Sequence, residues 1–182
     1  MTIGRRHGKK TAQDNLARAL YAEIDFNTCD MDIFLERSPP LSELRQKLED
    51  DCKLVPHITD ARHTEIYRAH LNGIHSISDQ TLQQCVQFYG LLEKIWVQIE
   101  GVNYPSYRTL SLEGRCNAVD VIKRTARTAS VCGAALLRDF EKEYASLNLT
   151  RFDREKFDLS DDELGVKKKS IGDKLDAKRM GQ

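Results

Sequence analysis

The stretch that decides the fold is LEGRCNAVDVIKRTARTASVCGAALLRDFEKEYASL, residues 112–147. Its apolar side chains recur at steps of three and four residues, the spacing that places them on one face of an α-helix. The stripe consists of Leu112, Cys116, Val119, Ile122, Ala126, Ala129, Gly133, Leu136, Phe140, Tyr144 and Leu147. It continues for about ten turns. The sequence therefore predicts one long helix that holds a single face against partner helices.

Four segments upstream show the same periodicity and predict the rest of the core. We expect helices over about 11–37, 41–52 and 78–100, and a short one that Thr59 or Asp60 caps and that ends near Leu71. No segment of any length alternates with a period of two residues, so no strand is predicted. The fold class is therefore all-α, a four- to five-helix antiparallel bundle with a long fifth helix.

The fifth helix is expected to be longer than its partners. It should begin between Ser106 and Ser111 and end near Asn148, which at 1.5 Å per residue gives roughly 55–60 Å, against about 40 Å for the first helix. It should therefore overhang the bundle or bend at Gly114 or Gly133. The small residues in its middle would let a neighbouring helix approach closely; they are Ala126, Ala129, Gly133 and Ala134.

Composition divides the chain into three parts and excludes several classes of protein. We expect a basic disordered arm over residues 1–10, a helical bundle domain over 11–148 and a charged, mostly disordered tail over 149–182. The 182 residues carry 28 basic and 28 acidic side chains, so the net charge gives no general attraction to nucleic acid or to an anionic membrane. No apolar run could span a bilayer and no secretory signal is present.

These features predict a cytoplasmic protein with reduced cysteines. The chain has five cysteines and no C-x-x-C pair, which favours free core thiols over a disulfide scaffold or a zinc site. His57, His63, His70 and His75 lie within nineteen residues, but no H-x-x-x-H or E-x-x-H pair occurs. We therefore expect no metal and no cofactor.

Two patterns raise an enzymatic or nucleic-acid alternative. Arg68 and His75 have an R-x6-H spacing that resembles the Arg/His pair of the helical HEPN ribonucleases. That resemblance implies an Arg that stabilises charge on an RNA phosphate and a His that moves a proton. Ala69 and the helix-breaking Asn72-Gly73 pair depart from the family pattern. On the fifth helix, three basic residues could contact phosphate; they are Lys123, Arg124 and Arg127.

Three motifs between residues 16 and 99 resemble a broad group of uncharacterised bacterial proteins that carry a cytosolic helical domain, often behind an N-terminal membrane anchor. The motifs are ALYAEI at 19–24 followed by Asn27, TEIYRAH at 64–70 followed by Ile74, and VQFYGLL at 86–92 followed by Ile95. The resemblance implies no activity, but it suggests that a polar cluster is buried between helices, either as a hydrogen-bond network that sets the register of the helices or as a small ligand pocket. Its expected members are Glu23, Asn27, Tyr67 and Tyr89.

Taken together, the sequence predicts a non-catalytic intracellular interaction, sensor or scaffold domain. We expect a protein partner, or self-association through the overhanging fifth helix. The basic N-terminal segment, GRRHGKK at residues 4–10, also predicts peripheral contact with the inner face of a membrane.

Overall fold

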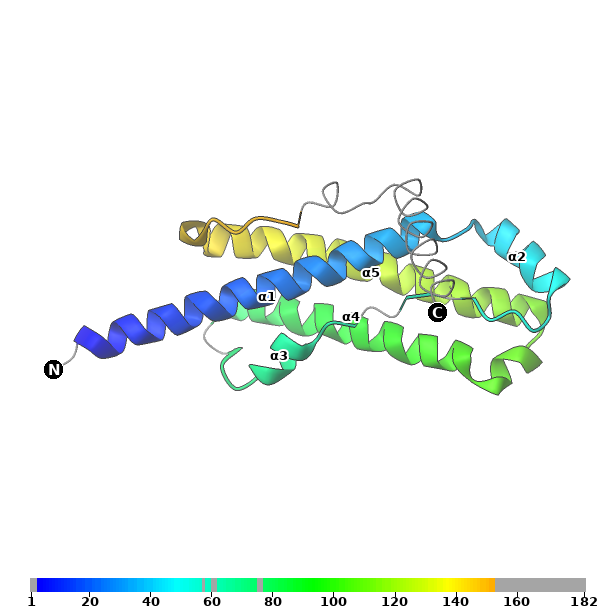
Figure 1. Ribbon diagram of the computed structural model, residues 1–182, viewed down its shortest axis with the longest axis horizontal. Helices are drawn as coiled ribbons and strands as arrows, with labels where there is room; N and C mark the ends of the chain where they lie inside the picture. The colour runs from blue at the N-terminus through cyan, green and yellow to red at the C-terminus, as the bar shows by residue number, and fades with distance from the viewer. Residues whose placement is uncertain (1–2, 57, 60–61, 75–76, 153–182) are drawn as a thin grey trace, which may run out of the picture. The chain divides into compact units, whose positions relative to one another are not determined.

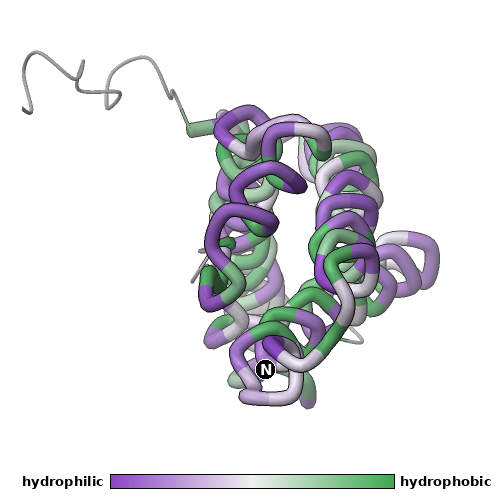
Figure 2. Tube along the Cα trace, turned by 90° about the vertical axis from the view of Figure 1, so that its right-hand side faces the viewer, coloured by the Kyte–Doolittle hydropathy of each residue, from purple (hydrophilic) through white to green (hydrophobic). Residues whose placement is uncertain are grey.

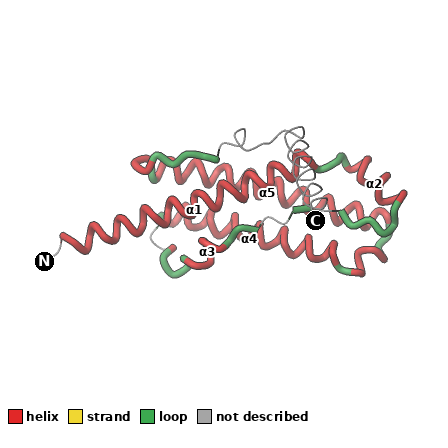
Figure 3. The backbone as a smooth tube through the Cα atoms, in the orientation of Figure 1, coloured by secondary structure: helices red, strands yellow, loops and turns green. Residues whose placement is uncertain are grey.

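A computed structural model of the protein describes residues 3–56, 58–59, 62–74 and 77–152, with side chains from Lys10 onward. Every regular element in these ranges is helical, as the prediction of an all-α fold requires (Figure 3). The elements are α1 (Ile3–Arg37), α2 (Leu41–Asp50), α3 (Glu65–Ala69), α4 (Asp79–Asn103), η2 (Pro105–Thr109), α5 (Leu112–Glu143) and η3 (Ala145–Leu147). They form one compact unit, Met1–Thr150, and a second unit begins at Arg151.

Three long helices form the body of the first unit. The chain runs along α1, returns through α2 and the connector to α3, and then runs along α4 in the same direction as α1 (Figure 1). Helix α5 runs in the opposite direction and packs against α1, α2 and α4. Hydrophilic and hydrophobic residues alternate along these helices, which is typical of helices that bury one face (Figure 2).

The core is built from the stripes that the periodicity predicts. In α5 the stripe from Cys116 to Phe140 is buried, and its part from Ile122 onward packs in one core cluster with Leu20, Ile24 and Met31 of α1. Helix α4 contributes four large side chains, Phe88, Tyr89, Leu92 and Ile95. The predicted long fifth helix, with one face packed against the other helices, is thus confirmed.

Helix ends follow local capping rules at α4 and α5 but not at α3. The Ser78 hydroxyl accepts a hydrogen bond from the Thr81 amide at the start of α4, and Ser111 does the same for the Gly114 amide at the start of α5. The predicted cap of the third helix at Thr59 or Asp60 is wrong. Helix α3 begins at Glu65 after Thr64, whose side chain makes no capping bond.

The first helix is longer than predicted. It begins at Ile3 and has 35 residues, so the expected disordered arm over residues 1–10 is helical from Ile3 onward. Once a helix has formed, each added residue gains a hydrogen bond without a new nucleation cost. Arg and Lys, which are frequent between residues 5 and 10, are good helix formers.

The predicted overhang of the fifth helix is wrong for two reasons. Helix α5 has 32 residues and spans about 48 Å, less than the roughly 52 Å of the 35-residue α1. Helix α2 also covers the start of α5, where Leu44 and Leu48 form a small separate cluster with Cys116 and Val119. The α5 surface on which we expected a second copy to bind is therefore partly used inside the molecule.

Gly133, a predicted bend or contact point, lies at a contact between three helices. A Cβ atom added there would lie 2.1 Å from Thr28 Oγ1 of α1 and 2.8 Å from Phe88 Cε2 of α4. The small middle of α5 thus lets α1 and α4 approach it. Gly133 is therefore covered by α1 and α4 of the same chain.

Candidate functional site

The buried carboxylate of Glu23 holds the start of α3 against α1. Its oxygens accept hydrogen bonds from the backbone amides of Ile66 (2.7 Å) and Tyr67 (3.0 Å) and from the Tyr89 hydroxyl (2.7 Å). The first amides of a helix lack partners within the helix and carry its positive dipole end, so an anion is favoured there. Glu23, which is only 4% exposed, therefore serves α3 as a cap supplied from another helix.

Asn27 fixes the chain just before α3. Its side-chain nitrogen donates to the carbonyl of His63 at 2.6 Å, and its side-chain oxygen accepts from the His63 amide at 3.1 Å. The same nitrogen also donates to the Glu23 carbonyl at 2.8 Å. Because Asn27 is fully buried, this pair of bonds satisfies a group that would otherwise destabilise the core.

Tyr67 and Tyr89 complete the polar cluster. Their rings stack with centroids 3.8 Å apart and planes 10° from parallel. Burial and the Glu23 carboxylate both raise the pKa of Tyr89, so its hydroxyl stays protonated and keeps donating. The structure brings the four predicted residues together: Glu23 accepts from the Tyr67 amide and the Tyr89 hydroxyl, Asn27 bonds to the Glu23 carbonyl, and the two tyrosine rings stack.

Arg68 and His75 receive no support as a catalytic pair. Arg68 is exposed on α3 and donates to the Glu93 carboxylate of α4 at 3.1 Å, a carboxylate that also contacts Arg62 at 2.6 Å. His75 lies outside the described residues.

The three basic residues of the fifth helix lie in different surroundings. Lys123 is half-buried and donates to the Pro39 carbonyl at 2.8 Å, so it fastens the turn between α1 and α2. Arg124 pairs with Asp120 one turn away at 3.0 Å. Arg127 is exposed and makes no ion pair within the described part of the chain. Only Arg124 and Arg127 therefore share a surface that a partner could reach.

That surface is an open groove of about 630 Å³ between α4 and α5, which we call the α4/α5 groove. Helix α4 contributes Gln84 and Gln87, and helix α5 contributes Arg124, Arg127, Thr128, Val131, Cys132 and Ala135. Val131 is 65% exposed, the largest exposed fraction among the large apolar side chains described. Sequence reasoning found the two arginines but missed the rest, because α4 and α5 form the groove jointly.

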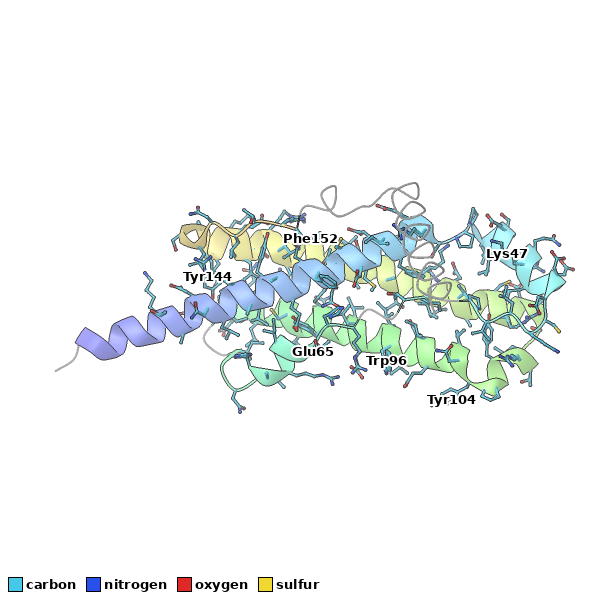
Figure 4. The ribbon with its side chains drawn as sticks, in the orientation of Figure 1. Lys47, Glu65, Trp96, Tyr104, Tyr144 and Phe152 are labelled. Atoms are coloured by element: carbon cyan, nitrogen blue, oxygen red, sulfur yellow. The ribbon has the colours of Figure 1, made fainter. Side chains whose placement is uncertain are left out.

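Two smaller hollows lie elsewhere. One, of about 360 Å³, contains Asp30 and Arg37 of α1 near Pro39. Burial raises the pKa of Asp30, and nearby His63 lowers it again in part. The other, of about 330 Å³, lies on α4 between Trp96 and Tyr104, both labelled in Figure 4. The Arg62 guanidinium stands 5.0 Å above the Trp96 ring. Both hollows are about half the size of the α4/α5 groove.

Two further charged side chains, which the sequence reasoning missed, cap helices from a distance. Arg115 of α5 is buried and donates to the carbonyls of Leu48 (2.9 Å) and Cys52 (3.1 Å) at the end of α2. Glu143 at the end of α5 accepts from the hydroxyls of Ser78 (2.7 Å) and Thr81 (2.6 Å) at the start of α4. Each side chain carries the charge that the helix dipole favours at that end: the cation of Arg115 lies at a helix C-terminus, and the anion of Glu143 lies at a helix N-terminus.

The described residues contain no group of three or more His, Cys, Asp or Glu side chains that could hold a metal ion. None of the helices in these ranges is both long and apolar enough to cross a membrane. Comparison of the chain with protein-family models, with curated proteins and with solved structures found no match.

Proposed function

We propose that this protein is a helical interaction domain that binds a partner protein in the α4/α5 groove. The observation that carries the proposal is the groove itself, with its exposed apolar side chain Val131 and two guanidinium groups on one surface. Surfaces that combine an exposed apolar patch with a polar rim are typical of binding sites.

The use of the other polar groups supports this choice. Glu23, Asn27, Arg115, Lys123 and Glu143 each bond to the backbone or side chains of another helix or connector. Their bonds give them a role in holding short elements to long helices, whereas the residues of the α4/α5 groove form a surface that partners can reach.

The proposal keeps two expectations from the sequence. An intracellular location is supported by the five cysteines, all of which are free thiols. Kinship with the bacterial helical-domain group is proposed on the three sequence motifs alone.

The test is a selection of peptides from a random displayed library against the full chain. The selected peptides are then tested against the double variant Val131→Gln/Ala135→Gln, which makes the apolar part of the groove lining polar and bulkier without changing the net charge. The control is Val97→Gln, which alters a similarly exposed valine of α4 (58%, against 65% for Val131) that is not a groove residue.

We expect selected peptides that bind the wild type and the Val97→Gln variant equally, and the groove variant at least tenfold more weakly. About 1.4 kcal/mol of lost binding free energy corresponds to that factor. If every selected peptide binds the groove variant as well as the wild type, the groove is not the binding surface and the proposal fails.

A further inference from the structure

The charge of the α4/α5 groove restricts the kind of partner. Its lining holds two guanidinium groups, Arg124 and Arg127, and no carboxylate. The two acidic residues nearest in α5 are already engaged, since Asp120 pairs with Arg124 at 3.0 Å and Asp139 accepts from Gln84 at 2.8 Å. In a chain whose net charge is zero, this groove is thus a locally basic surface, and its electrostatic complement is anionic.

The polar edge that α4 presents to the groove is also free of carboxylates. Residues spaced by three and four along this edge are Gln80, Gln84, Gln87, Leu91, Lys94 and Gln98. The acidic residues of α4's middle and end, Glu93 and Glu100, fall outside this series, and Glu93 pairs with arginines on the α3 side. The α5 edge therefore attracts an acidic occupant, and the α4 edge does not repel one.

The apolar part of the groove lining disfavours a bare phosphate backbone as the occupant. Val131, Cys132 and Ala135 are apolar or weakly polar, and they gain from contact with apolar side chains but not from contact with phosphate. No aromatic side chain lines the groove, so bases have no ring on which to stack. The occupant must combine an apolar face with carboxylates.

The length of the groove fits a short helix. Arg124 and Ala135, at the two ends of the lining in α5, are separated by eleven residues, which is about 16 Å or three helical turns. A hollow between two parallel ridges is the geometry into which an amphipathic helix lays its apolar face. The described part of the chain has no exposed strand edge that could instead pair with an extended peptide.

We infer that the α4/α5 groove binds an acidic amphipathic helix of a partner protein, with its apolar stripe on Val131 and Ala135 and its carboxylates on Arg124 and Arg127. This inference rests on the proposed function and specifies the partner at the same surface. Arg127 is its main charged contact, because Arg124 already shares its charge with Asp120.

The experiment measures fluorescence anisotropy of two labelled synthetic helices with the full-length protein. Both carry leucine at the same i, i+3, i+4 and i+7 positions; one has glutamate at its flanking positions, and its twin has lysine there. The protein variants are Arg127→Glu and, as the matched control, Arg108→Glu. Arg108 is an exposed arginine of η2 outside the groove, so both variants change the net charge equally.

We expect the acidic helix to bind wild type at least tenfold more tightly than its basic twin. Arg127→Glu should weaken the acidic helix at least tenfold and strengthen the basic twin, whereas Arg108→Glu should change either by less than twofold. Raising the salt concentration should weaken the acidic helix only, because screening reduces its ionic contacts.

Three outcomes would overturn the inference. Equal binding of the acidic and the basic helix would show that charge does not select the partner. Equal effects of Arg127→Glu and Arg108→Glu would show that the helix does not bind in the α4/α5 groove. Tighter binding of a labelled single-stranded oligonucleotide than of the acidic helix, abolished by Arg127→Glu, would assign the groove to nucleic acid. If the library selection yields groove-dependent peptides that are not acidic, the proposed function stands and this inference fails.

Discussion

Replacement of Gly133 by alanine tests the packing of the whole bundle at one atom. The added Cβ would lie 2.1 Å from Thr28 Oγ1 and 2.8 Å from Phe88 Cε2, well inside the separation that such atoms tolerate. Thr28 is 5% exposed and Phe88 is fully buried, so neither side chain can move into solvent. Overpacking of a dense core costs about 1–3 kcal/mol.

Two opposing terms decide the sign of the change. Alanine is favoured over glycine inside a helix by about 1 kcal/mol. Since both contacts at Gly133 are severe, we take the overpacking cost at its upper end, about 3 kcal/mol. The net loss in the free energy of unfolding is then about 2 kcal/mol. With a urea slope of about 2 kcal/mol per molar, the midpoint should fall by about 1 M.

The matched control is Gly90→Ala in α4. Gly90 is exposed, and a Cβ atom built there meets nothing within 4 Å, so only the helix-propensity gain remains. This variant should be more stable than wild type by about 0.5–1 kcal/mol. The two glycine replacements should therefore differ by about 2.5–3 kcal/mol when unfolding is followed by circular dichroism.

A second-site change locates the clash. Thr28→Ala removes the hydroxyl nearest the new methyl group, so it should recover at least 1 kcal/mol in the Gly133→Ala background, as a double-mutant cycle measures. A Gly133→Ala variant as stable as wild type would refute the close approach of α1 to α5.

Four further predictions follow from the helix ends and the cysteines. Glu23→Gln should lower the free energy of unfolding by about 2–3 kcal/mol and speed hydrogen exchange of the amides at the start of α3. The reason is that the side-chain amide offers one acceptor oxygen where the carboxylate offers two. Unchanged exchange would contradict the role of Glu23 as the cap of α3. Arg115→Met should lower stability by about 3 kcal/mol and release α2, measured as faster proteolysis after α2, because two helix-end carbonyls lose a charged donor. Partial burial acts to raise the pKa of Glu143, but its hydrogen bonds outweigh burial and leave the pKa below the usual 4.5. The Glu143 carboxylate therefore stabilises the fold above pH 4.5, and this stabilisation is lost as the pH falls through the lowered pKa. The difference in the free energy of unfolding between wild type and Glu143→Gln should thus shrink below pH 4.5. Exposed Cys52 should react first with a thiol reagent, while burial, which raises the pKa of Cys85 to about 12, should leave Cys85 unreactive until the protein unfolds.

The sequence carries enough information to predict the long helices because their signal is local. The stripe over 112–147 and the caps at Ser78 and Ser111 each lie within a few residues of the backbone they act on. The start of α3 could not be placed this way, because its cap is Glu23, 43 residues from Ile66. An acidic residue in α1 gives no sign in the sequence of which helix it will cap.

The candidate groove was predictable only in part for a related reason. Helical periodicity shows that Arg124 and Arg127 leave the core face of α5, but it does not show which outer edge of α4 lies beside them. The rotation of α4 depends on how Phe88 packs over Gly133, a contact between positions 45 residues apart. Gln84, Gln87 and Val131 therefore become groove residues only when both helices are in place.

The charged caps also set an order in which the polypeptide can complete its structure as a ribosome makes it. Glu23 is synthesised before the helix that it caps, so its carboxylate is already present when α3 is made. Arg115 and Glu143 instead arrive after α2 and α4, whose ends they bond. A nascent chain that stops short of residue 143 therefore lacks the carboxylate that bonds the start of α4, and that contact forms only after α5 has been made.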